Sequence, residues 1–315
     1  MDTNYGMEIV RATEISALTA ARQQGLGDHL EILSKARSAL AKTLSRLNIE
    51  GVIINDRFQN RSDLFQMPES VGKGGARMDL MAIAIEAHHS AADGGTNATS
   101  YAVIAPQGVI QSVPNLSMYK IVVGPQVGNV IDINQPPVTN VKRVARALRK
   151  YTENVTVCIL DQARHKQLIK EIRSCGARIK LINEGEISGC LSAITGEKAD
   201  IYIGYGFAPE GTLVAAAISC LGGYFEGKIF YENDRDRQAA ASHGITDYDK
   251  VFRVQDLVRS KEIAIAATGI TDGEFLQGVR FTSNGAITSS FIARAETKTY
   301  RKLETTHFFD FKPVF

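Results

Sequence analysis

Residues 200–221 read Asp-Ile-Tyr-Ile-Gly-Tyr-Gly-Phe-Ala-Pro-Glu-Gly-Thr-Leu-Val-Ala-Ala-Ala-Ile-Ser-Cys-Leu, and this stretch says most about the chain. Asp200–Ile203 reads as a short apolar strand and Thr212–Leu221 as an apolar helix, with a glycine-containing turn between them. Pro209 suits a first helical position, and Glu210 then falls in the first turn, where the helix dipole favours a carboxylate. The Glu either satisfies only the dipole, or acts as a rigidly held ligand for a cation or substrate.

Strands and helices alternate around this stretch, which predicts an α/β layer with helices against a sheet. We expect strands at 155–160, 179–182 and 262–267 and helices at 165–175 and 187–194. Before them we expect helices at 7–24 and 30–48, strands at 51–54 and 80–85, and a hairpin of 101–105 with 109–113. The chain turns β-rich again from 279 to 302.

The chain has 315 residues, which suits two domains, and the Gly- and Pro-containing segment 124–140 reads as the connection. We therefore expect an N-terminal domain at 1–135 and a C-terminal α/β substrate-binding domain at 136–315.

Apolar residues make up 44% of the chain and charged residues 22%, as in ordinary soluble proteins. A net charge of +2 and no basic stripe with interleaved aromatics argue against nucleic acid as a partner. We find no secretory signal and no membrane-spanning run, and the four cysteines have no CxxC or zinc spacing. We expect a cytoplasmic protein with reduced thiols.

A second informative segment, Ala267–Gly273, reads Ala-Thr-Gly-Ile-Thr-Asp-Gly. Together with Gly204–Gly211 it resembles the GGAPEG and ATGITdG segments of class II fructose-1,6-bisphosphatases, members of the lithium-sensitive phosphatase superfamily. Further segments resemble that family in the same order: Arg11–Glu14, Gly27-Asp28, Leu160–His165, Glu184–Glu186, Thr297–Arg301 and His307. The resemblance implies a layered αβαβα sandwich of the sugar-phosphatase type, hydrolysis of a sugar phosphate monoester, and a homodimer or homotetramer.

The resemblance also implies a metal centre that holds Mg²⁺ or Mn²⁺ through carboxylates. Such ions neutralise the phosphoryl oxygens and activate a water molecule. The matching positions are Asp28, Asp56, Glu86 and Glu210.

Two departures from the family pattern fall in this centre. Ile83 stands where the family has a bridging Asp, and Ala87-His88 replaces a Gly-Thr pair that cradles the phosphate and orients the attacking water. These changes count against the complete ion set. We take Glu86, His88 and Asp56 as the candidate catalytic residues, with His88 a possible general acid or base.

The substrate-binding half of the pattern is better kept. Arg164 matches the family's phosphate-contacting Arg, and a guanidinium suits a pair of phosphate oxygens. The remaining positions expected at the substrate are Glu184, Glu186, Ser117 and Lys120, with Ser117 in place of a family Tyr.

His88 and His89 lie near Asp79, Glu86 and Asp93 in the sequence, as in a transition-metal site. The alternative is a solvated polar loop. Three interpretations of the whole chain stay open. The first is an active metal-dependent sugar-bisphosphate phosphatase, and the second is a sugar-phosphate enzyme with different chemistry that need not use a metal ion. The third is a non-catalytic homologue that binds a ligand or a paralogue.

Overall fold

The computed structural model describes residues 5–54 and 67–311. The chain forms two compact units: unit 1 comprises residues 1–110 and 260–315, and unit 2 comprises residues 111–259. The domain boundary expected between residues 135 and 136 stays a prediction. Within the described ranges, none of the helices has the length and apolar character needed to cross a membrane.

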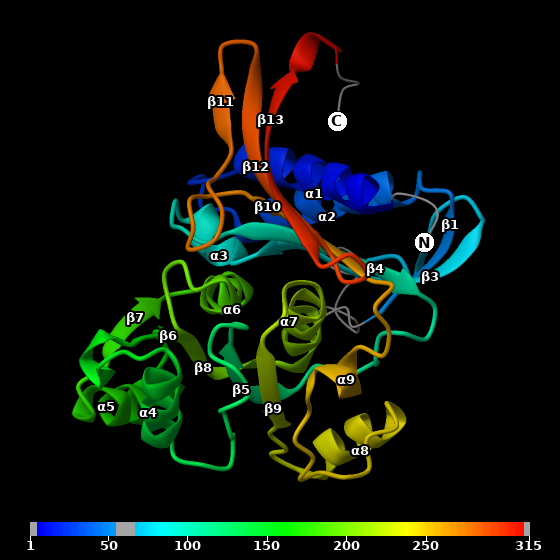
Figure 1. Ribbon diagram of the computed structural model, residues 1–315. Helices are drawn as coiled ribbons and strands as arrows, with labels where there is room; N and C mark the ends of the chain where they lie inside the picture. The colour runs from blue at the N-terminus through cyan, green and yellow to red at the C-terminus, as the bar shows by residue number, and fades with distance from the viewer. Residues whose placement is uncertain (1–4, 55–66, 312–315) are drawn as a thin grey trace. The chain divides into compact units, whose positions relative to one another are not determined.

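Unit 1 is built on one eight-stranded sheet (Figure 1). Its strands are β1 Ile49–Ile53, β2 Ser70–Val71, β3 Ala76–Glu86, β4 Thr99–Pro106, β10 Ala264–Gly269, β11 Arg280–Thr282, β12 Gly285–Arg294 and β13 Thr299–Phe308. The order is β11-β12-β10-β4-β3-β1-β2, and β13 pairs with β12. The β1–β3 pair is parallel, while β3, β4, β10 and β12 pair antiparallel.

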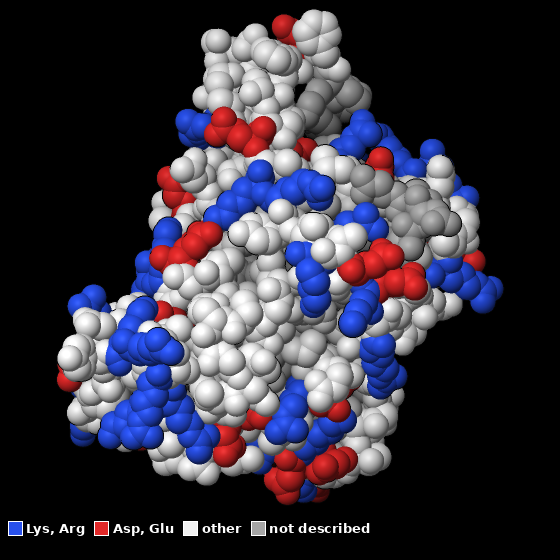
Figure 2. All heavy atoms as spheres, in the orientation of Figure 1, with Lys and Arg blue, Asp and Glu red and all other residues white. Residues whose placement is uncertain are grey.

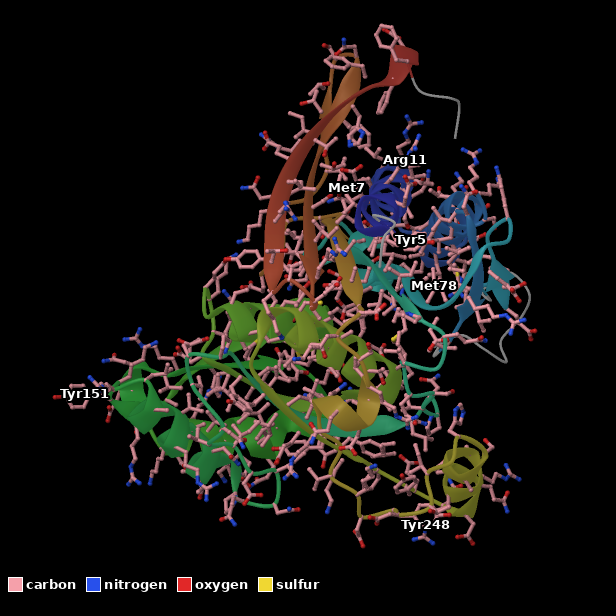
Figure 3. The ribbon with its side chains drawn as sticks, turned by 45° about the vertical axis from the view of Figure 1, so that its right-hand side comes forward. Tyr5, Met7, Arg11, Met78, Tyr151 and Tyr248 are labelled. Carbon is pink, nitrogen blue, oxygen red and sulfur yellow. The ribbon has the colours of Figure 1, made fainter. Side chains whose placement is uncertain are left out.

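Two long helices, α1 Tyr5–Ala21 and α2 His29–Leu44, pack against this sheet and each other (Figure 1). Apolar residues of α2 recur every three or four positions and are buried, as a helix on a sheet requires: Ile32, Leu33, Ala36, Leu40 and Leu44. Figure 3 marks the start of α1 with Tyr5, which is buried, and Met7, which is 46% exposed. The predicted helices are thus confirmed, with ends shifted by a few residues.

Unit 2 has a five-stranded sheet in the order β7-β6-β8-β5-β9. Its strands are β5 Ser117–Val123, β6 Thr156–Leu160, β7 Arg178–Ile182, β8 Ile201–Phe207 and β9 Tyr224–Ile229. Its helices are α4 Pro137–Ala147, α5 Lys166–Ser174, α6 Glu186–Thr195, α7 Ala208–Leu221, α8 Asp234–Ser242 and the short α9 Val254–Leu257. Helices α6 and α7 lie on one face of the sheet and α4 and α5 on the other (Figure 1). The predicted layered α/β class is confirmed.

The junction of β8 and α7 differs from the expected turn. The strand continues through Gly204 and Gly206 to Phe207, and α7 begins at the next residue, Ala208. Nearly every residue of α7 is buried, which explains why its sequence is apolar on all sides. Glu210 lies in the first turn as predicted.

The predicted hairpin around Pro106-Gln107-Gly108 is wrong. Strand β4 pairs with β3 and β10, and the segment after it does not return as a strand beside it. The buried Asp79 of β3 explains the difference, because its Oδ2 accepts the N–H groups of Gly108 at 2.8 Å and Ile110 at 3.2 Å. Burial raises the pKa of Asp79, and these backbone donors oppose that rise.

A basic surface covers part of unit 2. Figure 2 shows Lys and Arg side chains gathered over α4 and α5, at the lower left. Some have acidic neighbours: Lys150 Nζ lies 2.6 Å from Asp200, and Arg143 lies 4.0 Å from Asp132. On α4, Lys142 and Arg146 are exposed and Arg143 is half-buried, as expected of a helical face in contact with solvent.

Candidate active site

A pocket of about 570 Å³ opens in unit 2 at one end of its sheet. The antiparallel register places Ser117, the first residue of β5, opposite Phe207, the last residue of β8. Strand β6 runs parallel to β8, so the segment after β6, which carries Arg164, reaches the same end. The lining residues are Asn115, Leu116, Ser117, Arg164, Tyr205, Phe207, Phe230, Glu232 and Asp236.

Arg164 lies in the short 3-10 turn Ala163–His165, between β6 and α5. Its Nη2 donates to the backbone carbonyl of Tyr205 at 3.2 Å. One guanidinium nitrogen is thereby tied to β8, and the side chain is held at the wall of the pocket. A guanidinium carries five N–H donors, so others remain for an anion such as a phosphate group.

The neighbouring His165 is fully buried and anchors this turn. Its Nε2 accepts the N–H of Tyr205 at 2.8 Å, so the ring proton sits on Nδ1, which donates to the carbonyl of Leu160 at 2.8 Å. Burial lowers the pKa of His165, and the nearby positive charge of Arg164 adds to that effect. The imidazole is therefore a neutral structural group that positions Arg164.

Lys120 and Glu186 form a buried ion pair. Lys120 Nζ also donates to the carbonyl of Phe207 at 2.7 Å. The Glu186 carboxylate lies so close to β8 that a Cβ on Gly206 would clash with it. This contact thus requires glycine at position 206. The Lys120–Glu186 ion pair stabilises the end of β8 from its buried side.

The expected substrate residues therefore separate into two groups within unit 2. Arg164 and Ser117 line the pocket, whereas Lys120 and Glu186 form the buried pair behind the same strand end. Glu184 is half-buried in the loop before α6. Glu210 is buried in the first turn of α7.

In unit 1, Glu86 and His88 flank a single residue of unusual conformation. Strand β3 ends at the buried Glu86, and the five-residue helix α3 (His88–Ala92) begins at His88. Ala87 between them has φ 60° and ψ 41°, the left-handed region in which a residue with a Cβ is strained. The backbone thus adopts a glycine-type turn at a position where this chain has Ala.

Strand β3 is irregular just before this turn. Ile83 pairs with Tyr101 of β4, but Glu86 pairs with Thr99, so β3 carries one extra residue between the two pairs. Such a bulge re-aims the side chains that follow it and is frequent beside functional sites. Ile83 itself is half-buried.

The turn that carries Asp28 is bound to α3. The N–H groups of Gly25 and Gly27 donate to the carbonyls of Ala91 at 3.0 Å and Ala92 at 2.8 Å. The structure therefore brings the Gly-Asp turn to the helix that directly follows Glu86 and Ala87. Sequence segments more than sixty residues apart therefore meet here.

A histidine that the sequence did not single out joins this group. His29 Nε2 lies 2.7 Å from Asp93 Oδ1, and its ring contacts His89, with 5.0 Å between ring centroids. His88 and His89 also contact each other, at 3.9 Å. The expected neighbour Asp79 does not belong to the cluster, because it caps the turn after β4.

The described residues do not complete a cation site. Across 5–54 and 67–311, no three His, Cys, Asp or Glu side chains are arranged to hold a metal ion. Asp28 Oδ1 caps α2, since it accepts the N–H groups of Leu30 at 3.1 Å and Glu31 at 2.9 Å. Asp56 lies outside the described residues. Glu210 belongs to unit 2, whereas Asp28 and Glu86 belong to unit 1.

Several pocket residues were not predicted. Tyr205 and Phe207 alternate along β8, and this period of two was the available signal that both face the same side. Phe230, Glu232 and Asp236 follow β9, where Asn233 caps α8 by accepting two backbone N–H groups. The Asn cap was readable from the sequence, but its nearness to Arg164 depends on the fold of the sheet.

Comparison with known proteins shows which family and which proteins the chain is similar to. The family described as "Bacterial fructose-1,6-bisphosphatase, glpX-encoded" matches residues 3–307. A D-fructose 1,6-bisphosphatase class 2/sedoheptulose 1,7-bisphosphatase of Synechococcus sp. (strain JA-2-3B'a(2-13)) is 32% identical, over 98% of this chain and 97% of that protein. The protein of the same description from Trichodesmium erythraeum (strain IMS101) is 29% identical over the same shares.

Proposed function

Because the chain belongs to the bacterial class II fructose-1,6-bisphosphatase family, we propose that it is a sugar-phosphate-processing enzyme whose substrate binds in the unit 2 pocket. The family match covers nearly the whole chain, and so do the relatives of about 30% identity. The membership supports phosphate monoester hydrolysis as the reaction type. The identity of the sugar phosphate and the rate of its hydrolysis belong to this proposal.

One observation carries the substrate assignment: the pocket combines a guanidinium with aromatic walls and carboxylates. Arg164 suits a phosphate group. The rings of Tyr205 and Phe230 offer faces to the carbon skeleton of a sugar, and Glu232 and Asp236 offer acceptors for its hydroxyl groups. This combination matches the chemistry of a sugar phosphate.

The hydrolytic centre of this proposal lies in unit 1, around Glu86 and His88. There Ile83 replaces a carboxylate and His88 replaces a hydroxyl, relative to the family pattern. Loss of one metal-bridging carboxylate removes several kcal/mol of transition-state stabilisation, and each 1.36 kcal/mol is about tenfold in rate. We therefore propose that hydrolysis is slow in this chain.

A second candidate is an enzyme that acts on the same class of substrate by different chemistry. It is favoured by His88, whose imidazole follows the buried carboxylate Glu86 and is a side-chain type that serves as a general acid or base. In that case His88 would move a proton to or from a sugar phosphate without a metal ion.

Phosphate release tests both candidates. Fructose 1,6-bisphosphate or sedoheptulose 1,7-bisphosphate is incubated with the protein in Mg²⁺ or Mn²⁺, beside the double variant Ile83→Asp with His88→Thr. We expect release by the double variant to exceed that of the unmodified chain by about a hundredfold or more. Equal release by the two proteins would contradict the altered centre. If neither releases phosphate and no sugar phosphate raises the melting temperature, the substrate assignment is wrong.

A further inference from the structure

Strand β13 is a long edge strand. It pairs with β12 over all ten of its residues, and among the described residues it has no strand on its other side. Most of its side chains are exposed, including Tyr300 at 57% and Phe308 at 49%. In Figure 1, β11, β12 and β13 extend beyond the α1 and α2 layer of unit 1.

Two features that keep sheet edges from pairing, bulges and prolines, are absent from β13. The β12–β13 register is continuous from Arg294–Thr299 to Gly285–Phe308, without a bulge, and the strand contains no proline. A straight edge of this length offers a row of backbone donors and acceptors to another strand. Its charged residues then decide which partner strand it accepts.

The backbone pattern shows which residues face the free edge. Phe309 N–H donates to the carbonyl of Asn284 at 3.1 Å, which continues the β12–β13 register by one residue. Hydrogen-bonded and non-hydrogen-bonded pairs alternate in an antiparallel ladder. Odd-numbered residues of β13 therefore bond to β12, and even-numbered residues, from Tyr300 to Phe308, direct their N–H and C=O groups outward.

When two copies of β13 run antiparallel, the charges on their outward-bonding residues are complementary. Lys302 and Glu304 lie two positions apart, with the half-buried Leu303 between them. If a second β13 runs antiparallel and is centred on Leu303, Lys302 lies opposite Glu304 of the partner subunit, and the reverse pair forms as well. Centring on Lys302 or on Glu304 would instead place like charges opposite each other, which is destabilising.

We propose that β13 is a dimerisation strand that pairs with the β13 of a second copy of this chain, about a twofold axis at Leu303. Both copies use the same surface, as in an isologous dimer, and the two unit 1 sheets become one continuous sheet. The hydrogen-bonded pairs are those between even-numbered residues. Leu303, which packs against the core of unit 1, contacts Leu303 of the partner subunit. The inference does not depend on the proposed function.

A disulfide test measures the register. In a non-hydrogen-bonded antiparallel pair the two Cα atoms lie about 4.5 Å apart, within the range that a disulfide spans. Leu303→Cys should therefore give a covalent dimer under mild oxidation, resolved on a non-reducing gel. The matched control Tyr300→Cys should not, because its two copies would lie about 20 Å apart. Absence of the Leu303→Cys dimer, or equal cross-linking of both variants, overturns the register.

A charge-exchange test measures the interface. Sedimentation should show a dimer for the unmodified chain, with a dissociation constant raised about tenfold or more by Lys302→Glu or by Glu304→Lys. The double variant should recover dimerisation, although Glu304 also loses its 3.1 Å contact with Arg280. Glu296→Lys, in the turn outside the strand, is the control and should leave the dimer intact. A monomeric unmodified chain, or a dimer that tolerates both single changes, overturns the proposal; circular dichroism confirms that each variant is folded.

Discussion

His165 holds the backbone of Tyr205: its buried Nε2 accepts the Tyr205 N–H at 2.8 Å. The next residue back, Arg164, donates to the carbonyl of the same Tyr205 at 3.2 Å. Two consecutive side chains after β6 thus form hydrogen bonds with the backbone of one residue near the end of β8. These two hydrogen bonds position Arg164, the residue that we assign to phosphate binding.

The first prediction concerns the acid stability of this contact. The pKa of His165 is lowered in the folded chain, so between that value and the ordinary value of about 6.5 the unfolded chain binds more protons. Its contribution to stability is therefore complete above about pH 6.5 and is lost as the pH falls through the folded value. His165→Gln should reduce the free energy of unfolding by about 1–3 kcal/mol at neutral pH and flatten its fall between neutral and acid pH. Urea unfolding over a pH series measures both effects.

His243 provides the control for that experiment. Burial also lowers the pKa of His243, whose Nδ1 lies 2.7 Å from Ser112 Oγ. His243→Gln should also weaken the acid dependence while leaving sugar-phosphate binding unchanged. An acid dependence that stays the same in His165→Gln would show that this imidazole is not a proton-linked contact.

The second prediction concerns Arg164 itself. Arg164→Ala removes the guanidinium from the pocket, and a charge-assisted hydrogen bond contributes about 1.5–3 kcal/mol. Affinity for fructose 6-phosphate should fall about 10- to 100-fold by calorimetry, with a smaller loss for Arg164→Lys, which keeps the charge but not the planar fork. Arg173→Ala, on the exposed last turn of α5, is the matched control. Unchanged affinity in Arg164→Ala would rule out this residue as the phosphate anchor.

Sequence periodicity was sufficient to predict those helices and strands that depend on residues close together in the sequence. The α/β alternation of unit 2 and the helices α1 and α2 follow from apolar spacing, and the observed elements agree with the expected ones within a few residues. The same holds for Glu210, whose place in the first turn of α7 follows from Pro209 beside it.

The features that sequence periodicity did not predict depend on contacts between residues far apart in the sequence. Asp79 binds Gly108, 29 positions away, and this carboxylate replaces the expected hairpin. Gly206 lies within β8, and the space that its missing Cβ leaves is taken by the carboxylate of Glu186, a residue distant in the sequence. The pairing of His29 with Asp93 likewise depends on the docking of the Asp28 turn on α3. No local pattern carries this information.

The third prediction concerns the ion pair of Lys120 and Glu186. Lys120 is fully buried, so Glu186→Gln leaves a buried ammonium without its counter-charge, and such a change costs about 3–5 kcal/mol. The double variant Lys120→Met with Glu186→Gln should be destabilised by less than the sum of the single changes, since it buries no unpaired charge. Denaturant unfolding of the four proteins gives the coupling free energy. Additive effects would show that the two side chains do not act as a pair.

The fourth prediction concerns the strained turn between Glu86 and His88. Ala87 has φ 60°, and in this region a residue with a Cβ is less stable than glycine by about 1–2 kcal/mol. Ala87→Gly should therefore raise the free energy of unfolding by about 1 kcal/mol, despite the greater backbone entropy of glycine in the unfolded chain. Ala39→Gly is the matched control: it lies inside α2, where the same substitution should instead cost about 1 kcal/mol. Thermal and urea unfolding distinguish the opposite signs. Equal destabilisation by both changes would mean that the turn is not strained, and Ala87 would then give no reason to regard this segment as a glycine-type phosphate cradle.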